Sequence, residues 1–378
     1  MNVKSLKILS TSDNHLGHPR VSGEVMRENF IKYVYPKIKG IDIFFIVGDF
    51  FHTLLNMDGK AAFWSAVIIS EIKAICKENN VFLRVLRGTF THDRQQNQFF
   101  VADEETMLSQ DRQTKVFDEI TIEYLETLGI HILYVPDDLP YEDAFPVIEK
   151  VIRDHGLSKV DIALTHTYYD HLIPDNIPHR PNNTFNAEKF GKLVSGVILN
   201  GHVHTTAIRG KVITNGSLER MNHGEEEDKG FYLVDLVKRE NEWNFTYNFV
   251  VNEGSTIFKT IDVVGYSTED SLTIFTTQLK EILNVYTSTD KVINLRIVTS
   301  DTVTYDALSA YVRTNYSNVN LDKKKVSSDL DYTQDLQTYT TELPIITPAN
   351  ISGMLKEHIF KTSNLSLSEE YITSMMRP

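Results

Sequence analysis

The chain has 378 residues and is 41% hydrophobic and 24% charged, which predicts a globular protein with two folded units. It has no apolar run near the roughly 20 residues of a membrane span, no secretory-signal pattern and one cysteine, so we expect a cytoplasmic protein without disulfides or membrane contact. The net charge of −13 argues against simple electrostatic capture of nucleic acid, but carboxylates that bind cations contribute to this sum, so DNA binding is not excluded.

Short β-like runs alternate with helical patterns along the first 200 residues. Strands are predicted at 7–11, 43–47, 81–87, 131–135, 161–165 and 197–200. Helices are predicted between them at 24–39, 60–79, 117–128, 142–155 and 187–193. Further β-like runs follow at 211–214, 230–237 and 243–251. This alternation predicts an α/β fold with a largely parallel central sheet.

A turn-like stretch at 252–255 separates a second, smaller α/β unit from the first. Its predicted elements are a strand at 258–264, a helix at 269–283, a strand at 292–298, a helix at 304–314 and a last run at 319–326. Residues 327–347 are rich in Ser, Thr, Asp and Gln, which indicates a linker. Two short amphipathic helices are predicted at 348–360 and 366–376. The predicted organisation is therefore 1–254, 255–326, a linker at 327–347 and a helical segment at 348–378.

Carboxylates and histidines follow the first two predicted strands at the point where each strand ends. Asp13 and His15 lie two residues apart directly after the first strand, so both can face one point at its carboxyl edge. The pattern Asp-x-His alone is weak evidence for a metal site, because an Asp after a strand is more often a helix cap. Asp49 follows Gly48 and an apolar run that should be fully buried, and a buried carboxylate needs a compensating charge such as a cation.

Three more histidines follow later strands. His166 ends the strand at 161–165, and His202 and His204 follow the strand at 197–200. Each histidine alone is better interpreted as a core or turn residue. Together with the carboxylates, however, neutral imidazoles form a ligand set for Mn, Fe or Zn, and a bridging carboxylate can hold two such ions about 3.5–4 Å apart.

The order of these motifs resembles that of the calcineurin-like metallophosphoesterase superfamily. The motifs are Asp13-x-His15, Gly48-Asp49-x-x-His52, Thr91-His92-Asp93, His166 and Gly201-His202-x-His204. Residues 215–220 and 225–231 also resemble the stretch that follows the last motif in SbcD-type DNA repair nucleases. The resemblance implies that superfamily's β-sandwich flanked by helices, followed by a small α/β capping domain and C-terminal helices.

The resemblance implies a two-metal site. Carried over position by position, it gives one divalent ion the ligands Asp13, His15, Asp49 and His204, and the other Asp49, His166 and His202. Asp49 would bridge the two ions, which the resemblance suggests are Mn²⁺. His92 would stabilise or protonate the departing oxygen, and Asp93 stands where the family motif has an acid, so both are candidate catalytic residues.

One motif departs from the family pattern. The family has Gly-Asn-His followed by an acid, and its Asn supplies an oxygen to the second metal, whereas this chain has two residues between Gly88 and Thr91. We assign Thr91 to the Asn position, and a hydroxyl is a poorer donor than an amide oxygen. This predicts a second metal that is bound more weakly or exchanged more readily. The altered motif and the compact C-terminal part would suit a virus-encoded member.

The function that the resemblance implies is a metal-dependent DNA nuclease. It would be a 3′–5′ double-strand exonuclease and single-strand endonuclease that acts with an SbcC-type coiled-coil ATPase in DNA recombination, repair or replication. Residues 348–378 would dock on the ATPase, so removing the chain after Leu343 should abolish this association and spare the nuclease. A homodimer is also implied, with 60–79 and the segment after His92 as the candidate interface.

Two other functions are compatible with the sequence. The chain could be another metallophosphoesterase, acting as a protein phosphatase or a small-molecule phosphodiesterase. It could instead be a scaffold subunit with an impaired metal site, which the departure at Thr91 leaves open. On periodicity alone, the C-terminal helices could equally pack on the rest of this chain.

Overall fold

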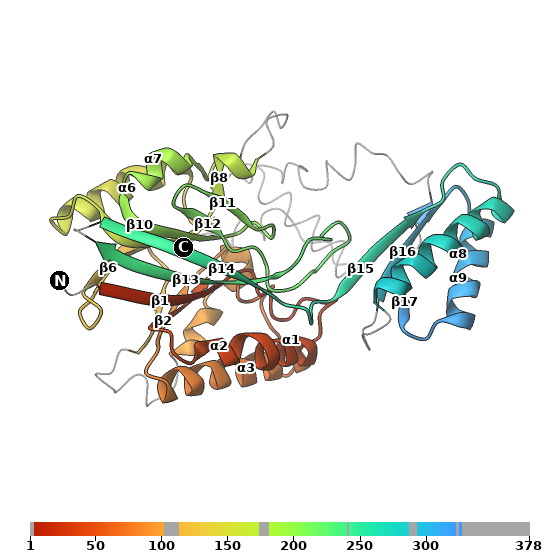
Figure 1. The fold of residues 1–378 in the computed structure, drawn as a ribbon, viewed down its shortest axis with the longest axis horizontal. Coiled ribbons are helices and arrows are strands. Elements are labelled where there is room, and N and C mark those ends of the chain that lie inside the picture. The colour runs from red at the N-terminus through yellow and green to blue at the C-terminus, as the bar shows by residue number, and fades with distance from the viewer. Residues whose placement is uncertain are drawn as a thin grey trace, which may run out of the picture.

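The computed structural model describes residues 4–101, 113–173, 181–239, 242–286, 293–322 and 325–326. Two six-stranded mixed sheets form the centre of the larger unit, and helices cover the outer face of each sheet (Figure 1). The predicted α/β class is therefore confirmed. Two packed sheets stand where the alternation of strands and helices predicted a single central sheet, whereas the resemblance implied a sandwich. Among the described residues, no helix combines the length and the apolar character that crossing a bilayer requires.

The first sheet combines the first four strands of the chain with two later strands. Its strands, in spatial order, are β14 (Glu242–Val251), β13 (Gly230–Arg239), β1 (Lys4–Thr11), β2 (Ile43–Val47), β3 (Phe82–Leu86) and β4 (Thr114–Phe117). Strands β1 to β4 are parallel, and β13 pairs antiparallel with β1. The helices that the structure describes between β1 and β4 are α1 (Gly23–Asn29), η1 (Phe30–Val34), α2 (Tyr35–Ile38), α3 (Lys60–Glu78), α4 (Phe90–Asp93) and η2 (Gln96–Phe100).

The second sheet follows in the chain and has a parallel centre. Its spatial order is β11 (Ala207–Arg209), β12 (Val212–Thr214), β10 (Val194–Gly201), β7 (Val160–His166), β6 (Ile130–Val135) and β5 (Thr121–Leu125). Helices α6 (Tyr141–Asp154) and α7 (Ala187–Gly191) pack on its outer face. The small elements β8 (Tyr168–Tyr169), η3 (Asp170–Leu172) and β9 (Thr184–Phe185) follow β7.

The core between the sheets comes from the inward-facing residues of both. Ile8 and Phe45 of the first sheet and Ile162 and Leu199 of the second belong to one fully buried apolar cluster. Because β2 and β7 are covered on both faces, their sequences are nearly continuous apolar runs rather than alternating ones. This packing brings the carboxyl ends of β2 and β7 close together, since Val47 O accepts a hydrogen bond from His166 Nδ1 (2.9 Å).

The prediction of a helix at 117–128 is wrong, because this segment forms the end of β4 and all of β5. Strand β5 pairs antiparallel with β6, and Leu125 lies opposite Ile130 across a tight turn. Gly129 within that turn has a φ of +57°, a conformation that glycine adopts without steric cost. The pairing of β5 with β6, which the local periodicity does not encode, therefore decides the structure of this segment.

The smaller unit has its own core and a four-stranded sheet. Its elements are β15 (Ile257–Asp262), α8 (Thr268–Val285), β16 (Ile293–Thr299), α9 (Thr302–Asn315), β17 (Val319–Leu321) and β18 (Lys325–Val326). The strands β15, β17 and β18 all pair parallel with β16. Figure 1 shows this unit beside the larger one, joined through β15. The predicted linker at 327–347 and helical segment at 348–378 lie outside the described residues.

A buried carboxylate lies where the chain passes from one unit to the other. Glu219 accepts hydrogen bonds from the side chains of Asn29 and Asn252 and from the backbone N–H of Thr256. Burial is the largest influence on this group, and it raises the pKa of Glu219 to about 7 although the hydrogen bonds from Thr256 and Asn252 and the charge of Arg220 oppose the rise. The stretch 215–220 therefore contributes to the junction between the units.

Candidate metal centre

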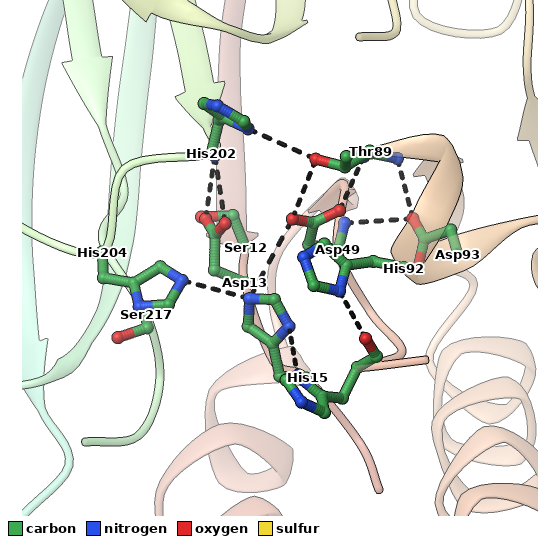
Figure 2. Close-up of polar contacts among 12 residues, drawn as sticks. Ser12, Asp13, His15, Asp49, Thr89, His92, Asp93, His202, His204 and Ser217 are labelled. Atoms are coloured by element: carbon green, nitrogen blue, oxygen red, sulfur yellow. Dashed lines mark hydrogen bonds and ion pairs between the residues drawn. The ribbon is translucent and has the colours of Figure 1, made fainter. Parts of the chain in front are cut away.

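The predicted ligands come together where the strands of both sheets end. Asp13 and His15 follow β1, Asp49 follows β2, His166 ends β7, and His202 and His204 follow β10. Figure 2 shows Asp13, His15, Asp49, His202 and His204 converging on one region from these elements. The candidate ligands therefore meet at the ends of strands that belong to two different sheets.

Backbone hydrogen bonds hold the two loops that carry the first ligands. The N–H of Asp13 donates to Gly48 O (3.0 Å), and the N–H of His15 donates to Asp49 O (3.0 Å). Four candidate ligands have left-handed backbone angles, with φ of +49° at Asp13, +47° at His15, +48° at Asp49 and +83° at His202. Such angles are uncommon outside glycine and cluster at functional sites.

Close packing around Gly48 lets His166 reach the site. A Cβ atom on Gly48 would lie 2.1 Å from His166 Nδ1, and the φ of Gly48 is +80°. A side chain at this position would displace the His166 ring. The glycine before Asp49 is therefore required by the site and not only by the turn.

The candidate ligands form two groups that could each hold a metal ion. Asp13, His15 and His204 form one, and Asp49, His166 and His202 form the other, with the ligand atoms of each group within 4.8 Å of one another. In the first group, His15 Nε2 lies 3.1 Å from His204 Nε2. Asp49 Oδ2 lies 3.2 Å from His166 Nε2 and 4.0 Å from His15 Nε2, so this carboxylate stands between the two groups.

The residues present fit a bound cation. His166 is fully buried, and its Nδ1 donates to Val47 O, so its Nε2 faces Asp49 Oδ2 at 3.2 Å. Burial opposes protonation of this ring, but the charge and hydrogen bond of Asp49 outweigh burial and raise the pKa of His166 to about 10, so in the metal-free protein the ring and the carboxylate share a proton. A divalent cation can replace this proton, because a buried imidazole nitrogen beside a buried carboxylate is a donor set that suits it.

Two other candidate imidazoles, unlike His166, are held in the neutral form. Burial lowers the pKa of His15 well below its ordinary value, because the Asp49 charge offsets only part of the desolvation. Burial and the nearby His166 lower the pKa of His202 to about 4. Both rings are therefore neutral at pH 7, the form in which imidazole binds metals.

The two predicted catalytic residues lie differently in the structure. His92 in α4 forms a hydrogen bond through Nδ1 with His52 O, and its ring centroid lies 4.9 Å from that of His15. Asp93 is fully buried and accepts from the N–H groups of Asp49 (3.0 Å), Phe51 (3.0 Å) and Gly88 (2.7 Å). His92 therefore lies at the ligand cluster, whereas Asp93 lies beneath it and holds the Asp49 loop in place.

Thr89, and not the predicted Thr91, lies beside the Asp49, His166 and His202 group. Thr89 Oγ1 lies 3.2 Å from Asp49 Oδ2 and 3.3 Å from His202 Nδ1, and its N–H donates to Asp49 Oδ1 (2.6 Å). Thr91 is exposed on α4. The physical reason is that the chain forms a helical turn immediately after Thr89, so the extra residues lie between Thr89 and His92.

Because Thr89 lies at the site, the substitution that tests the effect of the missing Asn is Thr89→Asn. We expect Thr89→Asn to strengthen Mn²⁺ binding at the Asp49, His166 and His202 group by about tenfold, because an amide oxygen replaces a weaker hydroxyl donor. Thr91→Asn is the matched control and should leave the affinity unchanged within about twofold. Calorimetric titration measures both variants. A gain in affinity with Thr91→Asn alone would contradict the assignment of Thr89.

Several residues near the ligands had no assigned role in the sequence. His52 Nδ1 lies 3.5 Å from His15 Nδ1, and Asp137 Oδ2 lies 3.8 Å from His202 Nδ1. Glu225 and the buried Lys229 lie behind His204. Of these, His52 belongs to the second motif of the sequence, and Glu225 and Lys229 belong to a stretch that was noted as a resemblance without a function. The roles of the individual site residues stay predictions.

Comparison with known proteins adds no family. No protein-family model matches the chain, and no curated protein matches it.

Proposed function

We propose that the protein is a phosphodiester hydrolase that uses two divalent cations and acts on DNA. The observation that carries this proposal is the position of the Asp49 carboxylate between the Asp13, His15 and His204 group and the His166 and His202 pair. A carboxylate with imidazoles on both sides suits two ions that share one ligand. The mixed nitrogen and oxygen donors accept Mn²⁺, which we propose as the ion, although intrinsic affinity favours Zn²⁺.

When bound, the two cations would supply Lewis-acid activation of water and would offset charge on the phosphoryl oxygens. The chain itself would position the metal-binding side chains and supply a proton to the leaving group. His92 Nδ1 donates to His52 O, so its Nε2 remains to hold the proton that the departing oxygen takes up. Asp93 orders the backbone of the Asp49 loop from below.

Two features favour DNA over a small phosphoester as the substrate. The motif order and the stretches at 215–220 and 225–231 resemble SbcD-type nucleases. The smaller unit also lies next to the site loops, since Asp322 contacts Arg20, which follows His15 by five residues, at 3.4 Å. A unit at this position would restrict which substrates reach the centre, in agreement with the capping role that the resemblance implies.

The test is cleavage by the purified full-length protein with Mn²⁺. We expect degradation of labelled duplex and single-stranded DNA and little hydrolysis of phosphoprotein or of p-nitrophenyl phosphate. His92→Ala should lower the DNA cleavage rate by about 10²–10⁴-fold, the usual contribution of a general acid, and leave Mn²⁺ affinity nearly unchanged. His155→Ala, at the exposed end of α6, is the matched control.

The outcomes separate the three functions. Hydrolysis of phosphoprotein or p-nitrophenyl phosphate without DNA cleavage would favour another metallophosphoesterase. Mn²⁺ binding without any hydrolysis would favour a scaffold subunit. Equal activity in His92→Ala and the unaltered protein would contradict the role of His92.

The proposed homodimer has support from exposed apolar side chains. They lie around α3 and η2, two elements that contact each other: Leu54, Met57, Phe63, Phe90 and Phe99. Sedimentation velocity should therefore give a dimer, and Phe63→Ser should shift it toward monomer, because Phe63 is 59% exposed in the single chain. A monomeric unaltered protein at micromolar concentration would refute the dimer. Docking of 348–378 on an SbcC-type ATPase stays a prediction.

A further inference from the structure

The imidazole of His204 has a carboxylate on the side away from the ligand cluster. His204 Nε2 faces His15 Nε2 at 3.1 Å, whereas its Nδ1 lies 3.4 Å from Glu225 Oε1. A carboxylate can only accept at this contact, so the proton of a neutral His204 must lie on Nδ1. Nε2 then carries the lone pair that points toward the cluster.

A buried lysine fixes the carboxylate of Glu225. The side chain of Lys229 is fully buried, and its Nζ lies 3.0 Å from Glu225 Oε2 and 2.7 Å from Glu227 Oε1. The same ammonium donates to the backbone oxygen of His204 (3.0 Å). A buried ammonium requires anionic partners, so Lys229 holds Glu225 ionised and ties it to the strand end that carries His204.

No other candidate histidine ligand among the described residues has a carboxylate at hydrogen-bond distance behind its ring. His166 Nδ1 donates to the backbone oxygen of Val47. The carboxylate of Asp137 is 3.8 Å from His202 Nδ1, which is too long for a hydrogen bond. His15 has the ring of His52 at this position. Glu225 therefore gives His204 a partner that the other three ligands lack.

We infer that Glu225 is the positioning residue for His204 and that Lys229 holds Glu225 in place for this purpose. The inference rests on the proposed metal centre and deepens it. Glu225 fixes the tautomer and the ring orientation of His204, so that Nε2 would face a cation held by the Asp13, His15 and His204 group. A carboxylate behind a metal-binding histidine is typically worth 10–100-fold in metal affinity.

The loop that carries Glu225 is also fastened to the smaller unit. Lys259 in β15 contacts Glu226 (2.8 Å), and Asp322 contacts His223 (3.1 Å). Arg20 donates to Asn222 (3.2 Å) from the larger unit. Both units therefore hold the segment between them, which keeps Glu225 at a fixed distance from His204.

The test compares two glutamates that share one lysine. We expect Glu225→Gln to weaken Mn²⁺ binding by 10–100-fold in calorimetric titration of the full-length protein. Glu227→Gln is the matched control, because Glu227 contacts the same Lys229 ammonium but not His204, and it should change the affinity less than about threefold. Thermal unfolding of both variants shows whether either loses its fold.

A second measurement needs no variant. In Zn²⁺-loaded unaltered protein with ¹⁵N-labelled histidine, His204 should show a metal-shifted Nε2 and a protonated Nδ1. Metal on Nδ1, or equal losses of Mn²⁺ affinity in Glu225→Gln and Glu227→Gln, would overturn the positioning role and leave the metal centre standing. Unaltered protein that binds no Mn²⁺ would overturn the proposed centre and this inference together.

Discussion

Replacing Asp49 by Asn is expected to lower Mn²⁺-dependent DNA cleavage by about 10³-fold or more, because Lewis-acid stabilisation by a bound metal is worth several kcal/mol. Asp49 Oδ2 lies between His166 Nε2 and His15 Nε2, so one carboxylate serves both ligand groups. Asn has one oxygen fewer and no charge, and its amide N–H groups would face imidazoles. Both ions of the proposed centre should therefore be lost.

The substitution is conservative in every other respect. Asn tolerates the left-handed backbone that Asp49 adopts, with φ of +48°, so the loop should keep its course. Cleavage rates and calorimetric Mn²⁺ titration measure the effect. Asp235→Asn, on the exposed side of β13, is the matched control and should behave as the unaltered protein. A rate within tenfold of the unaltered protein would rule out Asp49 as the shared ligand.

The second large effect concerns a buried ion pair that joins the two sheets. Arg84 in β3 is fully buried and binds Glu123 in β5 through two hydrogen bonds, of 2.7 Å and 3.0 Å. Lys115 and the hydroxyl of Tyr134 also contact the Glu123 carboxylate. Removing the carboxylate would leave a guanidinium in the core with backbone oxygens as its remaining acceptors.

We therefore expect Glu123→Leu to lower the free energy of unfolding by about 3–5 kcal/mol at pH 7, the usual effect of breaking a buried pair from one side. Urea denaturation measures this quantity. The double variant Arg84→Met/Glu123→Leu is the control for volume, and it should recover most of the loss, since no buried charge remains unpaired. A loss below about 1 kcal/mol in the single variant would refute this account.

The same pair predicts a dependence on pH. Burial raises the pKa of Glu123, but the hydrogen bonds and charges of Arg84 and Lys115 outweigh burial and lower the pKa below its ordinary value of 4.5. A carboxyl with a lowered pKa stabilises the fold above pH 4.5 and loses this contribution as the pH falls through its folded pKa. The difference in stability between the unaltered protein and Glu123→Leu should therefore shrink below pH 4.5. A difference that stays constant down to pH 3 would contradict the charge-based explanation.

The ligand cluster could be predicted because it depends on local patterns. Asp13 and Asp49 each follow an apolar run that is long enough for one buried strand, and the carboxyl ends of parallel strands meet at one edge. The strands at 7–11 and 43–47 were therefore located nearly correctly. Their neighbours in the sheets depend on contacts between distant segments, which one sequence does not display.

The incorrect predictions also arise where the structure depends on more than local sequence spacing. The segment 117–128 has helix-like spacing, yet its pairing with β6 makes it a strand. Thr91 was chosen because the motif places the Asn position directly before the histidine, whereas a helical turn after Thr89 leaves Thr89 at the site and Thr91 exposed. The role inferred for Glu225 depends on Lys229 and His204, and no sequence spacing reveals that a lysine is fully buried between them.

The left-handed backbone at Asp13, His15, Asp49 and His202 limits how the thermal stability of the protein can be raised. Each such residue stores about 1 kcal/mol or more of strain, and a glycine would relieve it. A selection that rewards heat resistance of the metal-free protein would thus favour glycine at these four positions and remove the candidate ligands one by one. Engineering for thermal stability should keep these residues and substitute elsewhere, because here stability and the geometry of the proposed metal site place opposite demands on the same backbone.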